Sequence, residues 1–117
     1  MKFKLIPRRN KIKPAKFQDE WKELQQFCKS KDTWPLAIIN ADKLLDEALK
    51  KKRLKGKSMG ERLVEAQKLL TDNDGVWFAH NMAKKLLDES YNKLKESEVK
   101  KSLVGIRQAL RDLGALE

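Results

Sequence analysis

The residues best suited to chemistry near neutral pH lie in one short stretch, WFAHNMAKKLLDE, at positions 77–89. This stretch holds His80, the only histidine of the chain, three residues after Trp77. Histidine is the one side chain whose unperturbed pKa allows acid–base work at this pH. Lys84 can supply positive charge, and Asp88 can act as a base only if its pKa is raised, whereas the neighbouring lysines are expected to lower it. His80, Lys84 and Asp88 are therefore weak catalytic candidates, and the simpler interpretation makes His80 a buried residue with one hydrogen bond and Trp77 a core residue.

Paired carboxylates are the other arrangement that suggests chemistry. Asp42 and Asp46 are four residues apart, so they share one face of a helix and could together approach a metal ion. The alternative is that they contact neighbouring helices or pair with Lys43 and Lys50. One histidine and one cysteine, Cys28, are too few for a zinc site, so neither a metal nor a cofactor is expected. A single cysteine also excludes an internal disulfide and fits a reducing cytoplasm.

Positive charge is concentrated at the N-terminus. The 117 residues have a formal net charge of +10, and residues 1–16 carry seven basic residues and no acidic one. Basic arms of this kind contact phosphate backbones, although a solubilising tail is the plainer interpretation. The candidate nucleic-acid-binding residues of the arm are Lys2, Lys4, Arg8, Arg9, Lys11, Lys13 and Lys16.

A second basic cluster follows the longest apolar pattern of the chain. Cations near the C-terminal end of a helix are favoured by the helix dipole, so a solvated helix end explains this cluster as well as phosphate binding does. Its members are Lys50, Lys51, Lys52, Arg53, Lys55 and Lys57.

Hydrophobic spacing predicts an all-α fold, a small up-and-down bundle of four to five helices. A basic arm over 1–15 precedes a single helical domain over 16–117, and either the arm or the first helix is expected to stand apart from the bundle. Leu36, Leu69 and Leu87 are among the residues expected to face inward. The predicted helices are 16–30, 34–53, 58–71, 74–91 and 97–113.

Capping residues mark the ends of these helices. Asp32 or Thr33 is expected to cap the second helix, and Asn73 or Asp74 the fourth. Ser58 and Glu61 form a capping box for the third helix, with Glu61 reaching back to the backbone, and Gly114 fits the end of the last helix. Gly105 lies inside that last helix, where it costs about 1 kcal/mol relative to alanine, and a close helix contact or neutral drift would explain it.

No segment reads as a membrane span or an export signal. Apolar runs fall short of the roughly 18 residues that a span needs, and no apolar segment follows the basic N-terminus. The chain is therefore expected in the cytoplasm, without a membrane partner.

Three segments resemble small bacterial HEPN-like proteins (higher eukaryotes and prokaryotes nucleotide-binding domains). They are AIINADKLLDEALK, GKSMGERL and VWFAHNMAKKLLDE, in this order and spacing, and the resemblance covers about residues 34–114. ADKLLD at 41–46 and Trp77, Ala79 and His80 are its most specific parts.

The resemblance implies a ribonuclease site whose key residues are absent here. In that family an Arg, a polar residue and a second His follow the Ala-His pair, and the Arg and that His form a metal-independent ribonuclease site, generally paired across a symmetric dimer. At these positions this chain has Ala83, Lys84 and Asp88, while the following Glu89 matches. Metal-free RNA cleavage needs a base, an acid and a cation, so the expected protein is more a binding module than an enzyme.

Three functions follow for this chain. The first is a non-catalytic HEPN-like module that binds RNA or a ribonucleoprotein, such as the ribosome, through its basic arm. The second is a diverged, toxin-type ribonuclease that uses His80, Asp88 and Lys84. The third is an antitoxin-like or scaffold homodimer that associates through the helices predicted at 34–53 and 74–91.

Overall fold

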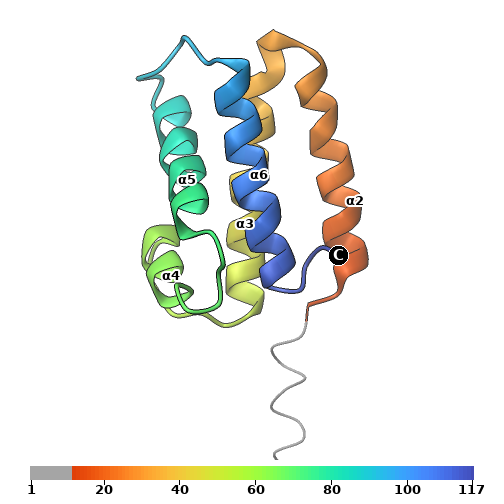
Figure 1. The fold of residues 1–117 in the computed structure, drawn as a ribbon, viewed down its shortest axis with the longest axis vertical. Helices are drawn as coiled ribbons and strands as arrows, with labels where there is room; N and C mark the ends of the chain where they lie inside the picture. Colours follow the sequence, from red (N-terminus) through yellow and green to blue (C-terminus); the bar gives the residue numbers. More distant parts are fainter. Residues whose placement is uncertain (1–11) are drawn as a thin grey trace, which may run out of the picture.

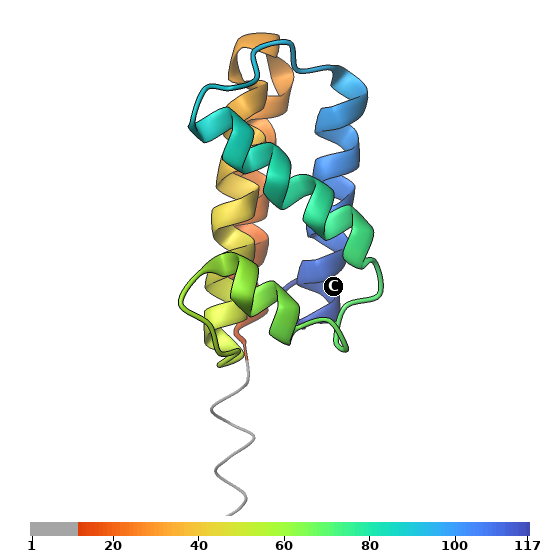
Figure 2. The same ribbon diagram turned by 90° about the vertical axis from the view of Figure 1, so that its left-hand side faces the viewer.

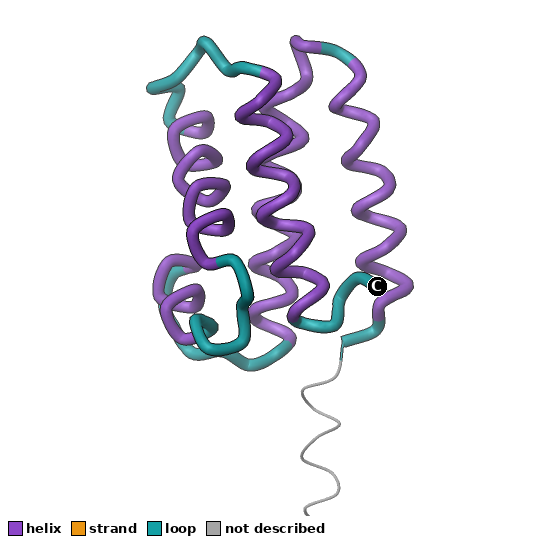
Figure 3. The backbone as a smooth tube through the Cα atoms, viewed as in Figure 1, coloured by secondary structure: helices purple, strands orange, loops and turns teal. Residues whose placement is uncertain are grey.

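The predicted all-α bundle is confirmed by the computed structural model, which describes residues 12–117 (Figure 1). Four longer helices run alternately up and down, and one short helix lies at the lower end of Figure 1. Figure 3 shows helices joined by loops, with no strand in the described range. The elements are α2 (Pro14–Leu24), η2 (Gln25–Lys29), η3 (Lys31–Thr33), α3 (Trp34–Lys51), α4 (Met59–Glu65), α5 (Asn73–Leu87) and α6 (Glu96–Asp112).

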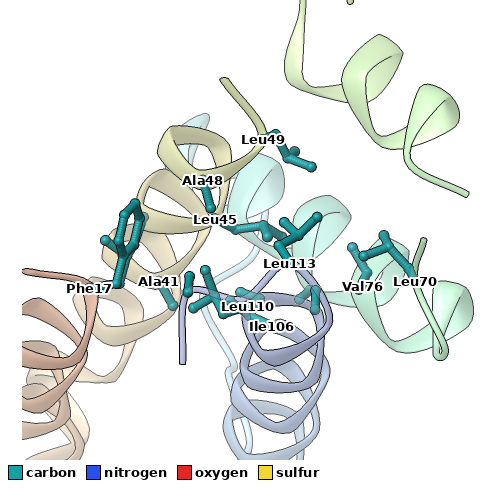
Figure 4. Packing of buried hydrophobic residues seen from close by; sticks show 14 of the residues in the cluster. Phe17, Ala41, Leu45, Ala48, Leu49, Leu70, Val76, Ile106, Leu110 and Leu113 are labelled. Carbon is teal, nitrogen blue, oxygen red and sulfur yellow. The ribbon is translucent and has the colours of Figure 1, made fainter. Parts of the chain in front are cut away.

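The first helix is part of the core, so the alternative in which this helix stands apart as an extra arm is wrong. Phe17, Trp21 and Leu24 lie on one face of α2 and are 1%, 8% and 4% exposed. They pack with residues of α3 and α6 in the main hydrophobic cluster (Figure 4). The apolar spacing of this helix therefore marks a buried face, and α2 already begins at Pro14, which sits in its first turn.

Helix α2 ends at Leu24 instead of continuing to residue 30, and the chain goes on in 3-10 turns whose carbonyl groups accept from later side chains. The hydroxyl of Thr33 donates to the carbonyl of Phe27 at 2.7 Å, and the indole N–H of Trp34 donates to that of Cys28 at 3.1 Å. These bonds hold the 3-10 turns of η2 in place. They also engage Thr33, so neither this residue nor Asp32 caps α3 with its side chain.

Two apolar clusters stabilise the bundle. The larger one joins α2, α3, α4, α5 and α6, and Figure 4 shows Leu45 of α3 close to Leu110 and Leu113 at the end of α6. The smaller cluster links α3, α5 and α6 with the loop before α6. Its buried members are Ile38, Met82, Ala83, Leu94 and Val99.

Helices α5 and α6 approach each other at two glycines. A β-carbon built on Gly105 would lie 2.5 Å from the carbonyl oxygen of Gly75, far inside van der Waals contact. In Figure 2, α5 runs obliquely across α6. A close helix contact therefore explains the glycine inside α6, and this interpretation of Gly105 is confirmed.

The third predicted helix is shorter than expected. Helix α4 ends at Glu65, and the chain continues through turns to Leu70 instead of as a helix to residue 71. At its start, Ser58 accepts from the backbone N–H of Glu61 at 3.2 Å, as predicted. The carboxylate of Glu61, however, accepts from the N–H of Lys57 and not from that of Ser58, so only half of the capping box forms as expected.

Asp72 caps α5, so the assignment of this cap to Asn73 or Asp74 is wrong. The carboxylate of Asp72 accepts from the backbone N–H of Gly75 at 3.0 Å. The amide of Asn73 instead donates to the carbonyls of Gln67 and Leu70, which closes the preceding turn. Local spacing could not identify Asp72 as the cap because Asn73 and Asp74 are equally good capping residues.

Three helices end in the same way, with one residue of positive φ. Arg53, Glu89 and Gly114 have φ values of 61°, 59° and 84° after α3, α5 and α6. In each case the next N–H bonds back to the helix five residues earlier, as in a Schellman motif: Leu54 to Leu49, Ser90 to Lys85 and Ala115 to Leu110. Gly114 is thus confirmed as a helix end, whereas the other two ends use residues that disfavour this conformation.

Helix α5 stops at Leu87, four residues before the predicted end, because the chain takes the positive φ of Glu89 there.

Some residues expected inside are exposed: Leu36 by 42%, Leu69 by 48% and Leu87 by 59%. Leu69 lies in the turns after α4, and Leu36 and Leu87 lie near helix ends. The last helix begins at Glu96, one residue before its predicted start. Among the described helices, none has the length and apolar character needed to cross a membrane.

Candidate functional site

His80 is paired with Asp42 inside the bundle. The Nδ1 atom of His80 on α5 lies 3.2 Å from both carboxylate oxygens of Asp42 on α3, and both residues are 8% exposed. Because an ionised carboxylate only accepts, the Nδ1–H donates. Burial raises the pKa of Asp42 above its ordinary value, and the hydrogen bond and charge of His80 oppose this rise. The simpler interpretation of His80, a buried residue with a hydrogen-bond partner, is confirmed.

Trp77 packs next to this pair. Its ring meets the ring of His80 edge to face, with centroids 5.9 Å apart and planes inclined by 73°. Trp77 is half-buried against the main hydrophobic cluster. It therefore serves packing, as the simpler interpretation predicts, and helps to fix the orientation of the imidazole.

Asp46 contacts a neighbouring helix and also pairs with Lys50, so both predicted alternatives to metal binding hold for this residue. Its carboxylate accepts from both Nε and Nη2 of Arg62, at 2.7 and 2.9 Å, and lies 3.6 Å from the ammonium of Lys50. The hydrogen bonds to Asp46 raise the pKa of Arg62, which also donates to the carbonyl of Gly56 at 2.8 Å. This forked contact ties α4 and the loop before it to α3. Spacing could not reveal Arg62 as a partner because it lies on a different helix.

The described part of the chain contains no group of three or more His, Cys, Asp or Glu side chains placed to hold a metal ion. Asp42 and Asp46 each face their own partner, the first His80 and the second Arg62. The two carboxylates that suggested a metal from spacing alone are therefore divided between two separate contacts.

Ala83 occupies an enclosed position. It is 0% exposed and lies in the smaller apolar cluster beside Ile38, Met82 and Val99. The HEPN-like resemblance would place the catalytic Arg at this position. A methyl group surrounded by apolar side chains can neither donate a hydrogen bond nor stabilise a charged transition state.

Asp88 caps the end of α5 at the surface. Its carboxylate accepts from the backbone N–H of Ser90 at 3.0 Å. This contact with Ser90, and secondarily the charge of Lys84, lowers the pKa of Asp88, so the predicted direction is confirmed and the role of a general base is disfavoured.

The three weak catalytic candidates do not form one site. In residues 12–117 no hydrogen bond or ion pair joins any two of His80, Lys84 and Asp88. Asp88 lies eight positions after His80, which is about 12 Å along the helix axis. His80 is buried against Asp42, whereas Lys84 and Asp88 are exposed.

The candidate nucleic-acid-binding residues that the structure describes lie together at the lower end of the bundle. Figure 1 places the start of α2, the end of α3 and the loop after it at this end, beside the end of α6. We name residues 13–16 and 50–57 the basic end. The first five arm candidates lie outside the described residues: Lys2, Lys4, Arg8, Arg9 and Lys11.

Within the basic end, two lysines form ion pairs. Lys16 lies 3.4 Å from Glu47 and 3.8 Å from Glu20, and Lys50 pairs with Asp46. The other members are exposed or half-exposed and have no ion pair within the described residues: Lys13, Lys51, Lys52, Arg53, Lys55 and Lys57. Leu54 packs against the main cluster, so the loop that carries several of them is anchored.

Comparison with known proteins gave no match: no family model fits the chain, and no curated protein and no solved structure is similar to it.

Proposed function

We propose that this protein is a non-catalytic HEPN-like module that binds RNA, or a ribonucleoprotein such as the ribosome, through basic residues at one end of its bundle. The observation that carries the proposal is the basic end itself. Two basic segments that are far apart in the sequence, 13–16 and 50–57, lie at the same end of the fold (Figure 1). The arm of residues 1–11, with five more Lys and Arg residues, joins the bundle at this end.

The charge at this end suits a phosphate backbone. Exposed lysines and arginines bind phosphates by releasing counterions, largely without regard to base sequence. The ammonium groups of Lys51, Lys55 and Lys57 are not used in ion pairs with the described acids. They can therefore contact RNA without first breaking an internal contact.

The interior supports a non-catalytic role. Within the described residues, the candidate catalytic positions either have a structural contact or lie apart from one another. His80 donates to Asp42, Asp88 holds the end of α5, and Ala83 provides no polar atom. What remains of the motif maintains the packing of α5 against α3.

Salt-dependent RNA binding tests the proposal. The affinity of the whole chain for a short single-stranded RNA is measured by fluorescence anisotropy over a range of salt concentrations. Deleting residues 1–11 leaves α2 whole and removes five cations, so the salt slope should fall by roughly 4 at about 0.7–0.9 per phosphate contact. The matched control replaces five exposed lysines elsewhere with glutamine: Lys29, Lys31, Lys84, Lys93 and Lys100. If the deletion and the control lower the salt slope equally, net charge alone explains the effect, and the role of the arm is refuted.

The catalytic alternative has its own test. Purified protein is incubated with RNA beside its His80→Ala variant, and no cleavage is expected from either. Cleavage by the wild type that disappears in the variant would overturn the non-catalytic proposal.

A homodimer through α3 and α5 stays a prediction. Each of these helices exposes one leucine, Leu36 and Leu87. Sedimentation at high protein concentration measures the mass, and a strict monomer would count against both the dimer and a site shared between two copies.

A further inference from the structure

A groove lies between α2, η2 and α3 and adjoins the basic end at Lys16. Its volume is about 640 Å³. Leu24, Phe27 and Leu44 give it an apolar floor, and the first and last of these are almost fully buried. Such a floor between two helices suits an extended segment that carries apolar side chains.

The rim of this groove is acidic in a strongly basic protein. Glu20 and Glu23 line it from α2 and Glu47 lines it from α3, whereas Lys43 is the one cation among its lining residues. Lys16 already places its ammonium between Glu20 and Glu47, at 3.8 and 3.4 Å. The lower part of the rim thus binds a cation from the chain just after the arm, and Glu23 has no ion pair within the described residues.

We propose that the groove binds residues 1–11 of the same chain. This segment, MKFKLIPRRNK, alternates apolar and basic residues at its start. Phe3, Leu5 and Ile6 match the apolar floor, and Lys2 and Lys4 match the acidic rim. A second copy, or a basic peptide of another protein, would be a different occupant.

The length of the arm allows this binding. The rim begins at Glu20, about 10 Å along α2 from Lys13 at the helical rise of 1.5 Å per residue. Residues 7–11 span up to roughly 16 Å when extended, which is enough for Phe3–Ile6 to reach the groove. The arm therefore reaches the groove of its own chain without any change in the bundle.

Binding in the groove would compete with RNA. The same cations cannot contact Glu23 and a phosphate backbone at once, so the acidic rim would hold back the arm until RNA displaces it. This competition rests on the proposed function, whereas the binding of the arm to the groove does not.

Photo-crosslinking tests the location of the arm. The whole chain is made with the photoreactive benzoylphenylalanine in place of Phe3, a similar aromatic side chain, and is irradiated without RNA. Mass spectrometry should find intramolecular crosslinks to 20–27 and 40–47. Crosslinks scattered over the bundle, or a crosslinked dimer, would overturn the proposal.

Charge variants with a matched control test the cause. The groove variant combines Glu20→Gln, Glu23→Gln and Glu47→Gln, and the control combines Glu65→Gln, Glu89→Gln and Glu96→Gln, all exposed and outside the groove. Each exposed ion pair shifts an equilibrium by roughly twofold, and two arm lysines match the rim, so the groove variant should lose up to about fourfold of its crosslink yield. The control should keep its yield, and equal losses in both would refute the role of the rim.

RNA binding separates this inference from the proposed function. Both variants gain the same net charge, so a larger gain in RNA affinity for the groove variant reports release of the arm. Equal affinities would refute the competition. If neither the wild type nor the variants bind RNA while the wild type still forms crosslinks to the groove, the proposed function fails and the binding of the arm to the groove stands.

Discussion

The contact between Gly75 and Gly105 makes a sharp prediction about stability. In Gly105→Ala the new β-carbon would lie 2.5 Å from the carbonyl oxygen and 2.6 Å from the carbonyl carbon of Gly75. Backbone atoms cannot rotate away, so α5 and α6 must separate by about 1 Å. Overpacking costs about 1–3 kcal/mol, and a clash with backbone atoms belongs in the upper part of that range, about 2–3 kcal/mol, while the better helix propensity of alanine returns about 1 kcal/mol. The net result should be a loss of roughly 1–2 kcal/mol in the free energy of unfolding.

Gly60 provides the matched control. It also lies in a helix, but a β-carbon there would meet only side-chain atoms of Ser58 and Trp77, both at 3.8 Å, which is ordinary contact. Gly60→Ala should therefore stabilise the protein by up to about 1 kcal/mol. The same chemical change should thus have opposite signs at the two positions.

Urea unfolding followed by circular dichroism measures both variants. At a slope of about 1–2 kcal/mol per molar urea, the midpoint of Gly105→Ala should fall by roughly 1 M and that of Gly60→Ala should rise. A Gly105→Ala protein as stable as the wild type would refute the close approach of α5 and α6.

Three further changes test other parts of the structure. Glu89→Gly should stabilise the protein by about 1 kcal/mol, seen as a higher melting temperature, because Glu89 has a φ of 59° at the end of α5; no gain would argue against this helix end. His80→Ala should destabilise by about 3 kcal/mol in urea unfolding because it leaves the carboxylate of Asp42 buried and unpaired, whereas a merely exposed histidine would cost little. Burial by itself raises the pKa of Asp112, but hydrogen bonds from Thr71 and Gln108 outweigh this effect, so the pKa lies below its ordinary value. The ionised carboxylate of Asp112 therefore stabilises the fold above its unfolded pKa, near 4, and this stabilisation is lost as the pH falls through the folded pKa. The free energies of unfolding of Asp112→Asn and wild type should differ by about 1 kcal/mol at pH 7 and become equal in acid.

The candidate site shows where reasoning from spacing stops. The pattern of residues 77–89 placed His80 on a buried helix face, because a side chain on the apolar side of an amphipathic helix must face the core. It could not identify Asp42 as the partner, since a contact between two helices depends on how far each is rotated and shifted against the other. The same holds for Arg62 and Asp46, whose forked contact decides that this carboxylate holds a loop and not a metal.

The sequence by itself determined the helical class, a bundle of four to five helices and most buried faces. Those properties depend on periodicity along the chain, which is local, and the faces of α2 and α6 follow it closely. The sequence also determined the uneven distribution of charge along the chain, because this distribution follows directly from the positions of the charged residues.

Tertiary structure decided which features meet. It brought residues 13–16 and 50–57 to one end, enclosed Ala83 among apolar side chains and opposed Gly75 to Gly105. The helix ends at Arg53 and Glu89 and the cap at Asp72 are local features that the sequence pattern missed. The shared basic end, the enclosed Ala83 and the glycine contact depend instead on packing between segments distant in the chain, which residue preferences of about 1 kcal/mol cannot specify.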